Sequence, residues 1–551
     1  MILSLFTINF MKHKYLQFIL MLLALASFQI SNADNIIVSG NVSGTWEVDT
    51  VKVIADINIA QGQSLLIQPG VLVQFQGSFN FDIKGSVKAI GAENLPIVFT
   101  VSDTTGFHAD SIPDGGWNGL RFSNLHPGVD SSLFTFCRFS YGKAVNPDSL
   151  KNYGGAICIR KTNKIAIRHC LFENSFAYYN GGAIYLEEAN ILVKDCDFVG
   201  NYAGRSIAPY GYGGAVCTDK GEPVIANNKF LNNSSTGIGG ALAIRFKDCP
   251  VHHNIFTGNY SALGGAIGIL HIPQCYHSLN NNLIANNSCA FFGGGVSNNN
   301  SSPTWINNTI VNNTSYSYGG GYYCFDSICP NVYNTILYGN NAGVGDQVYL
   351  FGTTSQTNFY NCDVQGGPQQ FGGSGGGAAF TGDYENNLDA DPLFMMAEPY
   401  LYALQPESPC INAGTADTTG LNIPEKDLAG NTRFFNNRID IGAYESQVIT
   451  GINDGEVIFA DAVLYSPSPN PACVSTNISF YLLQRCETGV QIFDIERKLV
   501  KNFEVMIMNE GLHQITWDLS DHSGRALPAG MYVCQLNCGN RSFTKKITIS
   551  R

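Results

Sequence analysis

The sequence has few charged residues, and it has no long apolar run after its first thirty positions. Charged residues make up 13 % of the 551 residues, about half the ~25 % of an average soluble protein. The 31 basic residues are outnumbered by 43 acidic ones, which argues against a nucleic-acid partner. No later stretch is long and apolar enough to cross a bilayer, so we expect no membrane-spanning segment in the mature chain.

The one apolar run lies in an N-terminal segment with the pattern of an export signal. Lys12 and Lys14 precede an apolar stretch over 16–30, and residues 31–33 (Ser-Asn-Ala) form a small-residue cleavage site. The apolar stretch is short for a membrane span. We therefore expect residues 1–33 to be removed, and the mature protein to be secreted or displayed on the outer cell surface.

Glycine is abundant, with 59 residues, and much of it belongs to a repeated motif. Gly-Gly followed by a small residue recurs seven times at spacings of 25 to 32 residues. Glycine permits the positive φ of a sharp corner, and the alternate apolar residues after most corners have the period of a strand. Units this small cannot bury a core alone, so they are predicted to stack. The copies begin at Gly154, Gly181, Gly213, Gly239, Gly264, Gly293 and Gly319.

A second motif, Phe or Ile with Asn three residues later, lies between the corners, as in Phe198/Asn201 and Phe230/Asn233. Two residues before the apolar position, the same residue type recurs from copy to copy. Stacked coils place identical positions in columns at ~4.8 Å, and asparagine columns form hydrogen bonds from amide to amide. The predicted column consists of Cys137, Cys170, Cys196, Asn228, Asn254, Asn282, Asn308 and Asn334.

These patterns predict an all-β chain: a right-handed parallel β-helix solenoid followed by a small, Ig-like β-sandwich. Short strands with different turn residues predict that the first part of the mature chain forms capping coils. The expected divisions are the signal peptide at 1–33, N-terminal capping coils at 34–135, β-helix repeats at 136–345, C-terminal coils with a closing segment at 346–445, a linker at 446–462 and the sandwich at 463–551.

Sixteen cysteines in an exported chain suggest disulfides. The three cysteines of the predicted column cannot all pair with one another, and buried free thiols behave as small apolar groups. We therefore favour free thiols in the column. Local disulfide candidates are Cys324/Cys329, Cys473/Cys486 and Cys534/Cys538.

Several stretches resemble known β-helix families. The paired Gly-Gly-Ala and Phe-x-x-Asn motifs over about 135–345 resemble the repeats of chlamydial polymorphic outer-membrane proteins, which implies a surface-exposed, adhesive β-helix. The opening, with 68–70 (Gln-Pro-Gly) and 117–119 (Trp-Asn-Gly), is similar to pectin-lyase-like proteins. Residues 408–445 resemble the terminal segment of bacterial surface β-helices, which implies that they close the solenoid. Their aspartates leave calcium open as a ligand, beside the simpler interpretation of a solvated loop without a cofactor.

Residues 463–551 resemble the type A sorting domain of the type IX secretion system. This resemblance implies the type IX secretion machinery as a partner, passage through the outer membrane, removal of the domain and a Bacteroidota-type host. The residues that carry the motif are Pro469, Asn470, Pro471, Gly530, Tyr532, Lys545 and Lys546.

Candidates for catalysis are few. Polysaccharide-cleaving enzymes on this scaffold need clustered carboxylates. Asp195 and Asp197 are predicted to share one outward strand face, and Arg245 with Lys247 echoes the Arg-x-Lys of polygalacturonases, although the other motifs of those enzymes are missing. A solvated strand face and a chance match remain the simpler interpretations.

Aromatic residues beside the corners are candidates for binding. Exposed rings on one edge of a solenoid suit contacts with a carbohydrate or protein surface, although they could equally pack locally over the corners. The candidates are Tyr178, Tyr179, Tyr210, Tyr212, Phe291, Phe292, Tyr316 and Tyr318.

The sequence therefore favours a non-catalytic surface protein that binds a glycan or a host surface protein. A polysaccharide lyase or glycoside hydrolase on the same scaffold stays the alternative, and a purely structural envelope component is a third possibility, because fold alone does not choose among them.

Overall fold

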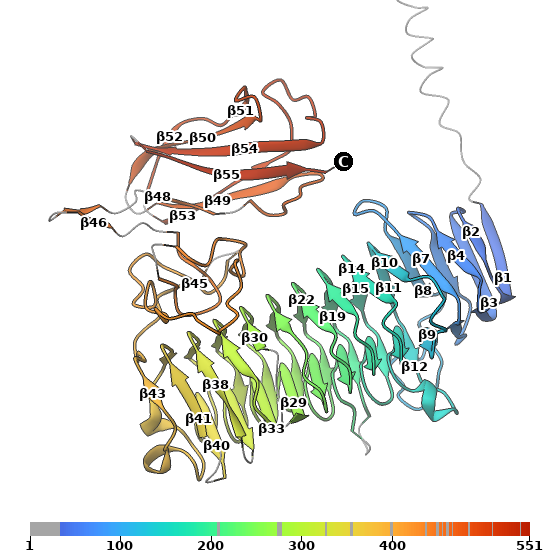
Figure 1. Ribbon diagram of the computed structural model, residues 1–551. Helices are drawn as coiled ribbons and strands as arrows, with labels where there is room; N and C mark the ends of the chain where they lie inside the picture. Colours follow the sequence, from blue (N-terminus) through green and yellow to red (C-terminus); the bar gives the residue numbers. More distant parts are fainter. Residues whose placement is uncertain are drawn as a thin grey trace, which may run out of the picture.

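The computed structural model gives an elongated solenoid with a smaller domain beside it (Figure 1). The predicted signal peptide, 1–33, lies outside the described residues. The structure describes residues 34–205, 210–272, 278–325, 328–352, 356–396, 400–435, 438–447, 451–453, 456–458, 462–465, 467–482, 485–509, 511–539 and 541–550.

The solenoid is a β-helix in which each coil contributes three main strands, and each strand pairs in parallel with the same strand of the next coil. The first row follows the Gly-Gly corners. It contains β6 (Phe81–Ile83), β9 (Leu120–Ser123), β13 (Ile157–Arg160), β17 (Ile184–Glu187), β21 (Val216–Asp219), β25 (Leu242–Arg245), β29 (Ile267–Ile272), β33 (Val296–Ser301), β37 (Tyr322–Phe325) and β40 (Val348–Phe351).

The second row forms a separate sheet of 13 strands. It contains β2 (Gly44–Trp46), β4 (Ser64–Ile67), β7 (Ser86–Ile90), β10 (Ser132–Thr135), β14 (Ile165–Arg168), β18 (Leu192–Lys194), β22 (Val224–Ala226), β26 (Val251–His252), β30 (Ser278–Asn280), β34 (Thr304–Ile306), β38 (Ile328–Tyr333), β41 (Gln356–Tyr360) and β43 (Tyr384–Glu385).

The third row carries the Phe-x-x-Asn motif. It contains β5 (Leu72–Phe75), β8 (Ile97–Val101), β11 (Cys137–Ser140), β15 (Leu171–Glu173), β19 (Asp197–Val199), β23 (Lys229–Leu231), β27 (Ile255–Thr257), β31 (Leu283–Ala285), β35 (Thr309–Val311), β39 (Ile336–Tyr338) and β42 (Asp363–Val364). The first coils are formed with β1 (Asn35–Asn41) and β3 (Thr50–Ile59). Strand β3 is long enough to pair with both β5 and β6.

Smaller elements complete the coils. Short strands follow the third row at β12 (Lys143–Ala144), β16 (Phe176–Ala177), β20 (Tyr202–Ala203), β24 (Ser234–Ser235), β28 (Tyr260–Leu263), β32 (Ser288–Phe292) and β36 (Thr314–Ser315), and 3-10 turns lie at η1 (Ser149–Lys151), η2 (Pro368–Gln370) and η3 (Gly377–Ala379).

The Gly-Gly corners need both glycines, for different reasons. The first glycine of each pair has a positive φ, for example 72° at Gly239 and 69° at Gly264, which L side chains rarely adopt. At the second glycine the space is filled: a Cβ on Gly240 would lie 2.1 Å from the carbonyl oxygen of Gly265 in the next coil. The first glycine therefore permits the sharp corner, and the second glycine permits neighbouring coils to stack closely.

The core consists of columns of identical side chains. Phe139, Phe172, Phe198, Phe230 and Phe256 are fully buried, and successive rings stack with centroids 4.7–4.9 Å apart and planes within 3–8° of parallel. This spacing equals the separation of neighbouring strands, so each ring lies on the ring of the next coil.

Two asparagine columns run beside the phenylalanines. At Asn259, Oδ1 accepts hydrogen bonds from the backbone N–H (2.9 Å) and side-chain Nδ2 (3.0 Å) of Asn233. Its own Nδ2 donates to the carbonyl of Phe230 (2.9 Å) and to Asn287 Oδ1 (2.8 Å). The column predicted from the sequence repeats this pattern from Asn228 through Asn308. The second column consists of Asn201, Asn233, Asn259, Asn287, Asn313 and Asn340.

The prediction for the last member of the first column was wrong. Register pairs Ile310 with Leu337, so the column position is Thr335, whose Oγ1 accepts from the N–H of Asn308. Asn334 instead lies in the left-handed turn before it, with φ of 49°. Ile336 and Leu337 are both apolar, so the sequence alone does not show that Leu337 is the equivalent of Ile310.

The cysteine column is free, as predicted: Cys137, Cys170 and Cys196 are buried thiols. Two predicted disulfides were wrong, because Cys486 pairs with Cys538, while Cys473 and Cys534 are free. Cys324 is disulfide-bonded, but the side chain of its predicted partner, Cys329, lies outside the described residues.

The last coil is covered by the turns that contain η2 and η3. Phe371 packs on Phe359 of β41 and on Phe380, with ring centroids 5.4 Å apart in each pair. The segment 408–445, predicted to close the solenoid, packs instead along its side, next to the hairpin of β44 (Phe394–Met395) and β45 (Ala403–Leu404) (Figure 1).

The C-terminal domain has two antiparallel sheets packed on one core around Trp517. One contains β48 (Ala462–Leu464), β49 (Thr476–Leu482) and β53 (Gly511–Trp517). The other contains β50 (Cys486–Asp494), β51 (Leu499–Asn502), β52 (Met506–Met508), β54 (Gly530–Cys538) and β55 (Arg541–Ile549). The predicted linker includes a small hairpin of β46 (Gly451–Asn453) and β47 (Glu456–Ile458).

Replacing one column asparagine should destabilise the solenoid. We expect Asn259→Ala to cost about 2–4 kcal/mol, because it leaves several buried hydrogen-bonding groups without partners. Chemical unfolding of residues 34–551, the chain without its predicted signal peptide and called the mature chain below, measures this loss, and the exposed Asn331→Ala is the matched control. Equal stabilities for the two variants would contradict the assignment of stability to the columns.

Candidate functional site

The first-row strands and the corners before them form an open groove of about 570 Å³ on one edge of the solenoid. Tyr179, Tyr210 and Tyr212, three of the predicted aromatics, lie in it. Its remaining lining residues are Ser149, Leu150, Tyr153, Asn180 and Arg245. We call this set the tyrosine groove.

The tyrosines of the groove are held by one another and by arginines. Tyr153 packs against Tyr179 (centroids 5.1 Å apart) and against the buried Tyr185 (4.6 Å). The Arg160 guanidinium lies 4.9 Å from the Tyr153 ring, and that of Arg245 lies 4.8 Å from the Tyr212 ring. These ring and cation–π contacts hold the tyrosines in place, so the groove presents ordered aromatic rings that are partly exposed.

A row of charges lies beneath the rings, at the last residue of four neighbouring first-row strands. Register places Arg160, Glu187, Asp219 and Arg245 side by side on successive coils. Arg160 pairs with Glu187 at 3.3 Å and Arg245 with Asp219 at 3.4 Å. The hydroxyl of Tyr185 also donates to Asp219. The four charges therefore compensate one another.

Most of the other predicted aromatics gather further along the same edge. Phe292 packs on Tyr318 with ring centroids 5.6 Å apart and lies next to Phe291, while Tyr316 is 84 % exposed. Tyr178 packs against Tyr179 but also contacts Arg205. Tyr323 and Tyr349, which sequence analysis missed, join the group around Phe292 and Tyr318.

The predicted carboxylate pair is not formed as expected. Asp195 lies in a left-handed turn (φ 55°) just before β19, within 3.6 Å of Lys194 and 3.7 Å of His169. Asp197 lies on β19, opposite Lys229 of the next coil. Strand alternation does not apply across the turn, so the prediction of a shared strand face was wrong.

Arg245 and Lys247 have separate surroundings. Arg245 belongs to the tyrosine groove, whereas Lys247 forms an ion pair with Glu222 at 2.5 Å. The two side chains therefore do not converge on one site, and their predicted similarity to the polygalacturonase pair has no geometric counterpart.

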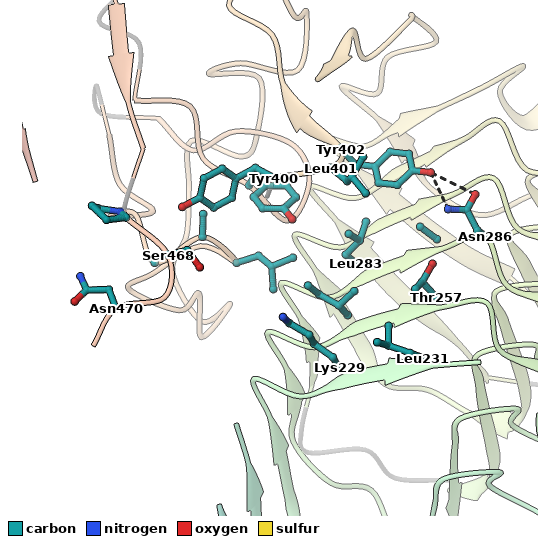
Figure 2. Close-up of a pocket in the computed structure, with 17 residues that line it drawn as sticks. Lys229, Leu231, Thr257, Leu283, Asn286, Tyr400, Leu401, Tyr402, Ser468 and Asn470 are labelled. Atoms are coloured by element: carbon teal, nitrogen blue, oxygen red, sulfur yellow. Dashed lines mark hydrogen bonds between the residues drawn. The ribbon is translucent and has the colours of Figure 1, made fainter. Parts of the chain in front are cut away.

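A second cavity of about 600 Å³ lies between the side of the solenoid and the C-terminal domain (Figure 2). Leu231 and Leu283 of the third row form its floor, and Tyr400 and Tyr402 overhang it. The Tyr402 hydroxyl is held by Asn286 at 3.0 Å. Ser468 and Asn470 of the C-terminal domain complete the wall, so this cavity depends on the placement of that domain.

Two aspartates of the segment 408–445, Asp427 and Asp440, are buried in a hydrogen-bonded cluster, whereas Asp417 is exposed. Asp427 accepts from the N–H groups of Asn431 and Glu445, and Asp440 accepts from those of Asn412 and Ser446, at 2.6–2.7 Å. Arg433, fully buried, pairs with Glu445 at 3.2 Å. These carboxylates already have donors, so they do not fit a calcium site, and within the described ranges no group of three or more His, Cys, Asp or Glu residues could hold a metal ion.

Burial of this cluster changes its titration. Three carboxyl groups share one guanidinium, and desolvation together with their mutual repulsion raises the pKa of Asp440 and that of Glu445. The cluster therefore keeps a proton that the unfolded chain would release.

The predicted sorting residues come together in the C-terminal domain. Asn470 donates to the carbonyl of Lys546 and accepts from the N–H of Thr548, both at 2.8 Å, which ties the Pro469–Pro471 loop to β55. The Tyr532 hydroxyl donates to the carbonyl of Pro528, and Gly530 begins β54. Lys545 reaches across to Asn431 Oδ1 at 3.2 Å.

The sequence analysis missed residues that line up across neighbouring coils but belong to no sequence motif. Tyr185, Glu187 and Asp219 carry no motif of their own. Alignment of the repeats on their Gly-Gly corners places Glu187 and Asp219 at one equivalent position, with Tyr185 two residues before Glu187, so the signal is present in the register.

Two family models match this chain. Residues 127–303 match the model of a right handed beta helix region, and residues 468–550 match a secretion system C-terminal sorting domain. No curated protein matches the chain. The chain thus contains a right-handed β-helix region and a C-terminal type IX sorting domain, which directs it to the cell surface or out of the cell and makes the secretion machinery a partner.

None of the helices among the described residues is long and apolar enough to cross a membrane.

Raising the pH should loosen the buried carboxyl cluster. Because the folded pKa values of Asp440 and Glu445 lie above the ordinary carboxyl range, the stability that the retained proton contributes is lost as the pH rises from that range through the folded values. We expect the Tm of the mature chain to fall between pH 6 and 9, measured by differential scanning fluorimetry. Glu445→Gln, which is always neutral, should show a smaller fall, and an identical fall would contradict the account.

Proposed function

We propose that this exported β-helix binds carbohydrate non-catalytically, as an adhesin or glycan binder, at the tyrosine groove. The observation that carries the proposal is the set of ordered, partly exposed rings of Tyr153, Tyr179 and Tyr212 in one open groove. A ring face buries the apolar C–H face of a sugar, while a tyrosine hydroxyl or a nearby amide meets its hydroxyl groups. Asn180 lines the groove wall, where its Oδ1 accepts from the backbone N–H of Tyr212 at 3.1 Å and its Nδ2 is the group that can donate to a sugar hydroxyl.

The sorting domain supports this function, because it directs the solenoid to the cell surface or out of the cell, where glycans are available as ligands. The groove is also suited to weak, reversible attachment. It is shallow and open, and its charges compensate one another, so binding would depend on ring contacts rather than on a strong electrostatic attraction. A host surface protein is the other class of ligand that an aromatic groove of this kind accepts.

Removing the groove tyrosines should weaken glycan binding. For the mature chain, residues 34–551, we expect Tyr179→Ala with Tyr212→Ala to reduce affinity by roughly tenfold or more, the usual loss when aromatic anchors are truncated. Binding to a panel of polysaccharides is measured by affinity electrophoresis. Tyr333→Ala, which removes a stacked tyrosine from the second-row sheet, is the control. Unchanged affinity in the double variant, or protein ligands alone, would overturn the proposal.

A polysaccharide lyase or glycoside hydrolase is the second candidate, and one observation favours it. Glu187 and Asp219 are register neighbours on adjacent coils beside the groove, which is the kind of carboxylate pair that glycoside hydrolysis uses. However, each carboxylate is engaged by an arginine, and neither can donate a proton to a glycosidic oxygen without giving up its ion pair. This engagement is why we place binding first.

Assaying for products separates the two candidates. We expect no new reducing ends and no unsaturated product from the mature chain on acidic or neutral polysaccharides, with or without calcium. Turnover that disappears in each of the single variants Glu187→Gln and Asp219→Asn would identify an enzyme and contradict the proposal of binding without catalysis.

A further inference from the structure

The residues just before the last five Gly-Gly corners form a continuous row along the edge of the solenoid, which extends one coil further to Val344 before Gly345 and which we call the pre-glycine row. Parallel bridges connect these positions from coil to coil, and every member is at least partly exposed. The row begins in the tyrosine groove and continues beyond it. Its members are Tyr212, Ile238, Leu263, Phe292, Tyr318 and Val344.

At its far end this row meets a second group of stacked rings. Tyr323 lies between Phe292 (centroids 4.8 Å apart) and Tyr349 (5.5 Å), and Tyr349 also packs on Tyr318 at 4.6 Å. Tyr323 is only 4 % exposed, whereas Tyr318 is 37 % exposed and Phe291 is 52 % exposed. We call Phe291, Phe292, Tyr318 and Tyr349, together with the buried Tyr323, the distal platform.

A low apolar strip connects the tyrosine groove with the distal platform. It carries Ile238 and Leu263 in the pre-glycine row and no aromatic ring. A Cβ on Gly268 would lie 2.2 Å from Cγ2 of Ile238, so the missing side chain leaves room for Ile238 to lie against the strand. Tyr212 and Tyr318 are four coils apart, about 19 Å at ~4.8 Å per coil.

The row of charged side chains at the ends of the first-row strands stops where the tyrosine groove stops. The row of Arg160, Glu187, Asp219 and Arg245 continues on the next coils with uncharged side chains. Register places Leu270, Asn299, Phe325 and Phe351 there. A ligand that follows the edge thus meets compensated charges first and then only uncharged groups in this row.

We propose that the distal platform is a second binding site for the same ligand, and that this ligand is a neutral, linear polysaccharide lying parallel to the solenoid axis. This inference rests on the proposed function. One chain then contacts the exposed parts of both ring groups and passes over the apolar strip between them. The second contact is intramolecular once the first has formed, so affinity rises when the chain is long enough to reach both groups.

The test measures how affinity depends on ligand length. Isothermal titration calorimetry is run with the mature chain and neutral β-linked gluco- and xylo-oligosaccharides of increasing length, from disaccharides upward. We expect a step of roughly tenfold to a hundredfold in affinity between oligosaccharides that reach one ring group and those that reach both. Tyr318→Ala with Tyr349→Ala should remove the step and lower the stoichiometry of short oligosaccharides from two sites to one, and the binding that remains at the tyrosine groove shows that the variant is folded. Tyr333→Ala should keep the step.

The outcomes separate this inference from the function beneath it. Binding that is independent of chain length, or a step that survives in the Tyr318/Tyr349 double variant, overturns the distal platform and leaves the tyrosine groove standing. Preference for acidic over neutral oligosaccharides overturns the neutral ligand class. No binding of any glycan overturns both the inference and the proposed function.

Discussion

In-register stacking of coils is the constraint on which the rest of this structure depends. Each coil is too small to bury its own apolar face, and it becomes stable only when the next coil repeats the same residue at the same place. The asparagine columns enforce that repetition, because each buried amide satisfies the coil before it and is satisfied by the coil after it. The second glycine of each corner enforces it again, because its Cα lies against a backbone carbonyl of the next coil.

The same register that builds the core also builds the surface. A residue that faces outward in one coil has its equivalent about 4.8 Å away in the next, so outward side chains form rows as regular as the inner columns. The compensated charges from Arg160 to Arg245 are one such row, and the pre-glycine row from Tyr212 to Val344 is another. A binding edge can therefore arise through ordinary substitutions within a row, without any change in the scaffold.

Much of the fold could be predicted from the sequence, because each local pattern recurs in many coils and every copy supports the same interpretation. The Gly-Gly corners and the Phe and Asn columns were predictable since each occurs many times. Thr335 was missed where a repeat offered two adjacent apolar residues, and Asp195 was misplaced because a left-handed turn interrupts strand alternation. The Cys486–Cys538 disulfide and the position of 408–445 depend on long-range packing that no periodic pattern records. In the candidate site, the corner tyrosines were predictable, but Tyr185, Glu187 and Asp219 needed the register between coils.

The most direct test of the account is a crystal structure of the mature chain with a neutral oligosaccharide long enough to reach from Tyr212 to Tyr318. The account predicts sugar density along the pre-glycine row, with sugar units against the exposed parts of the rings at both ends and continuous density over Ile238 and Leu263. Density in the cavity beneath Tyr400 and Tyr402, or on the second-row sheet, would contradict the claim that the row beside the glycine corners is the binding edge of this protein.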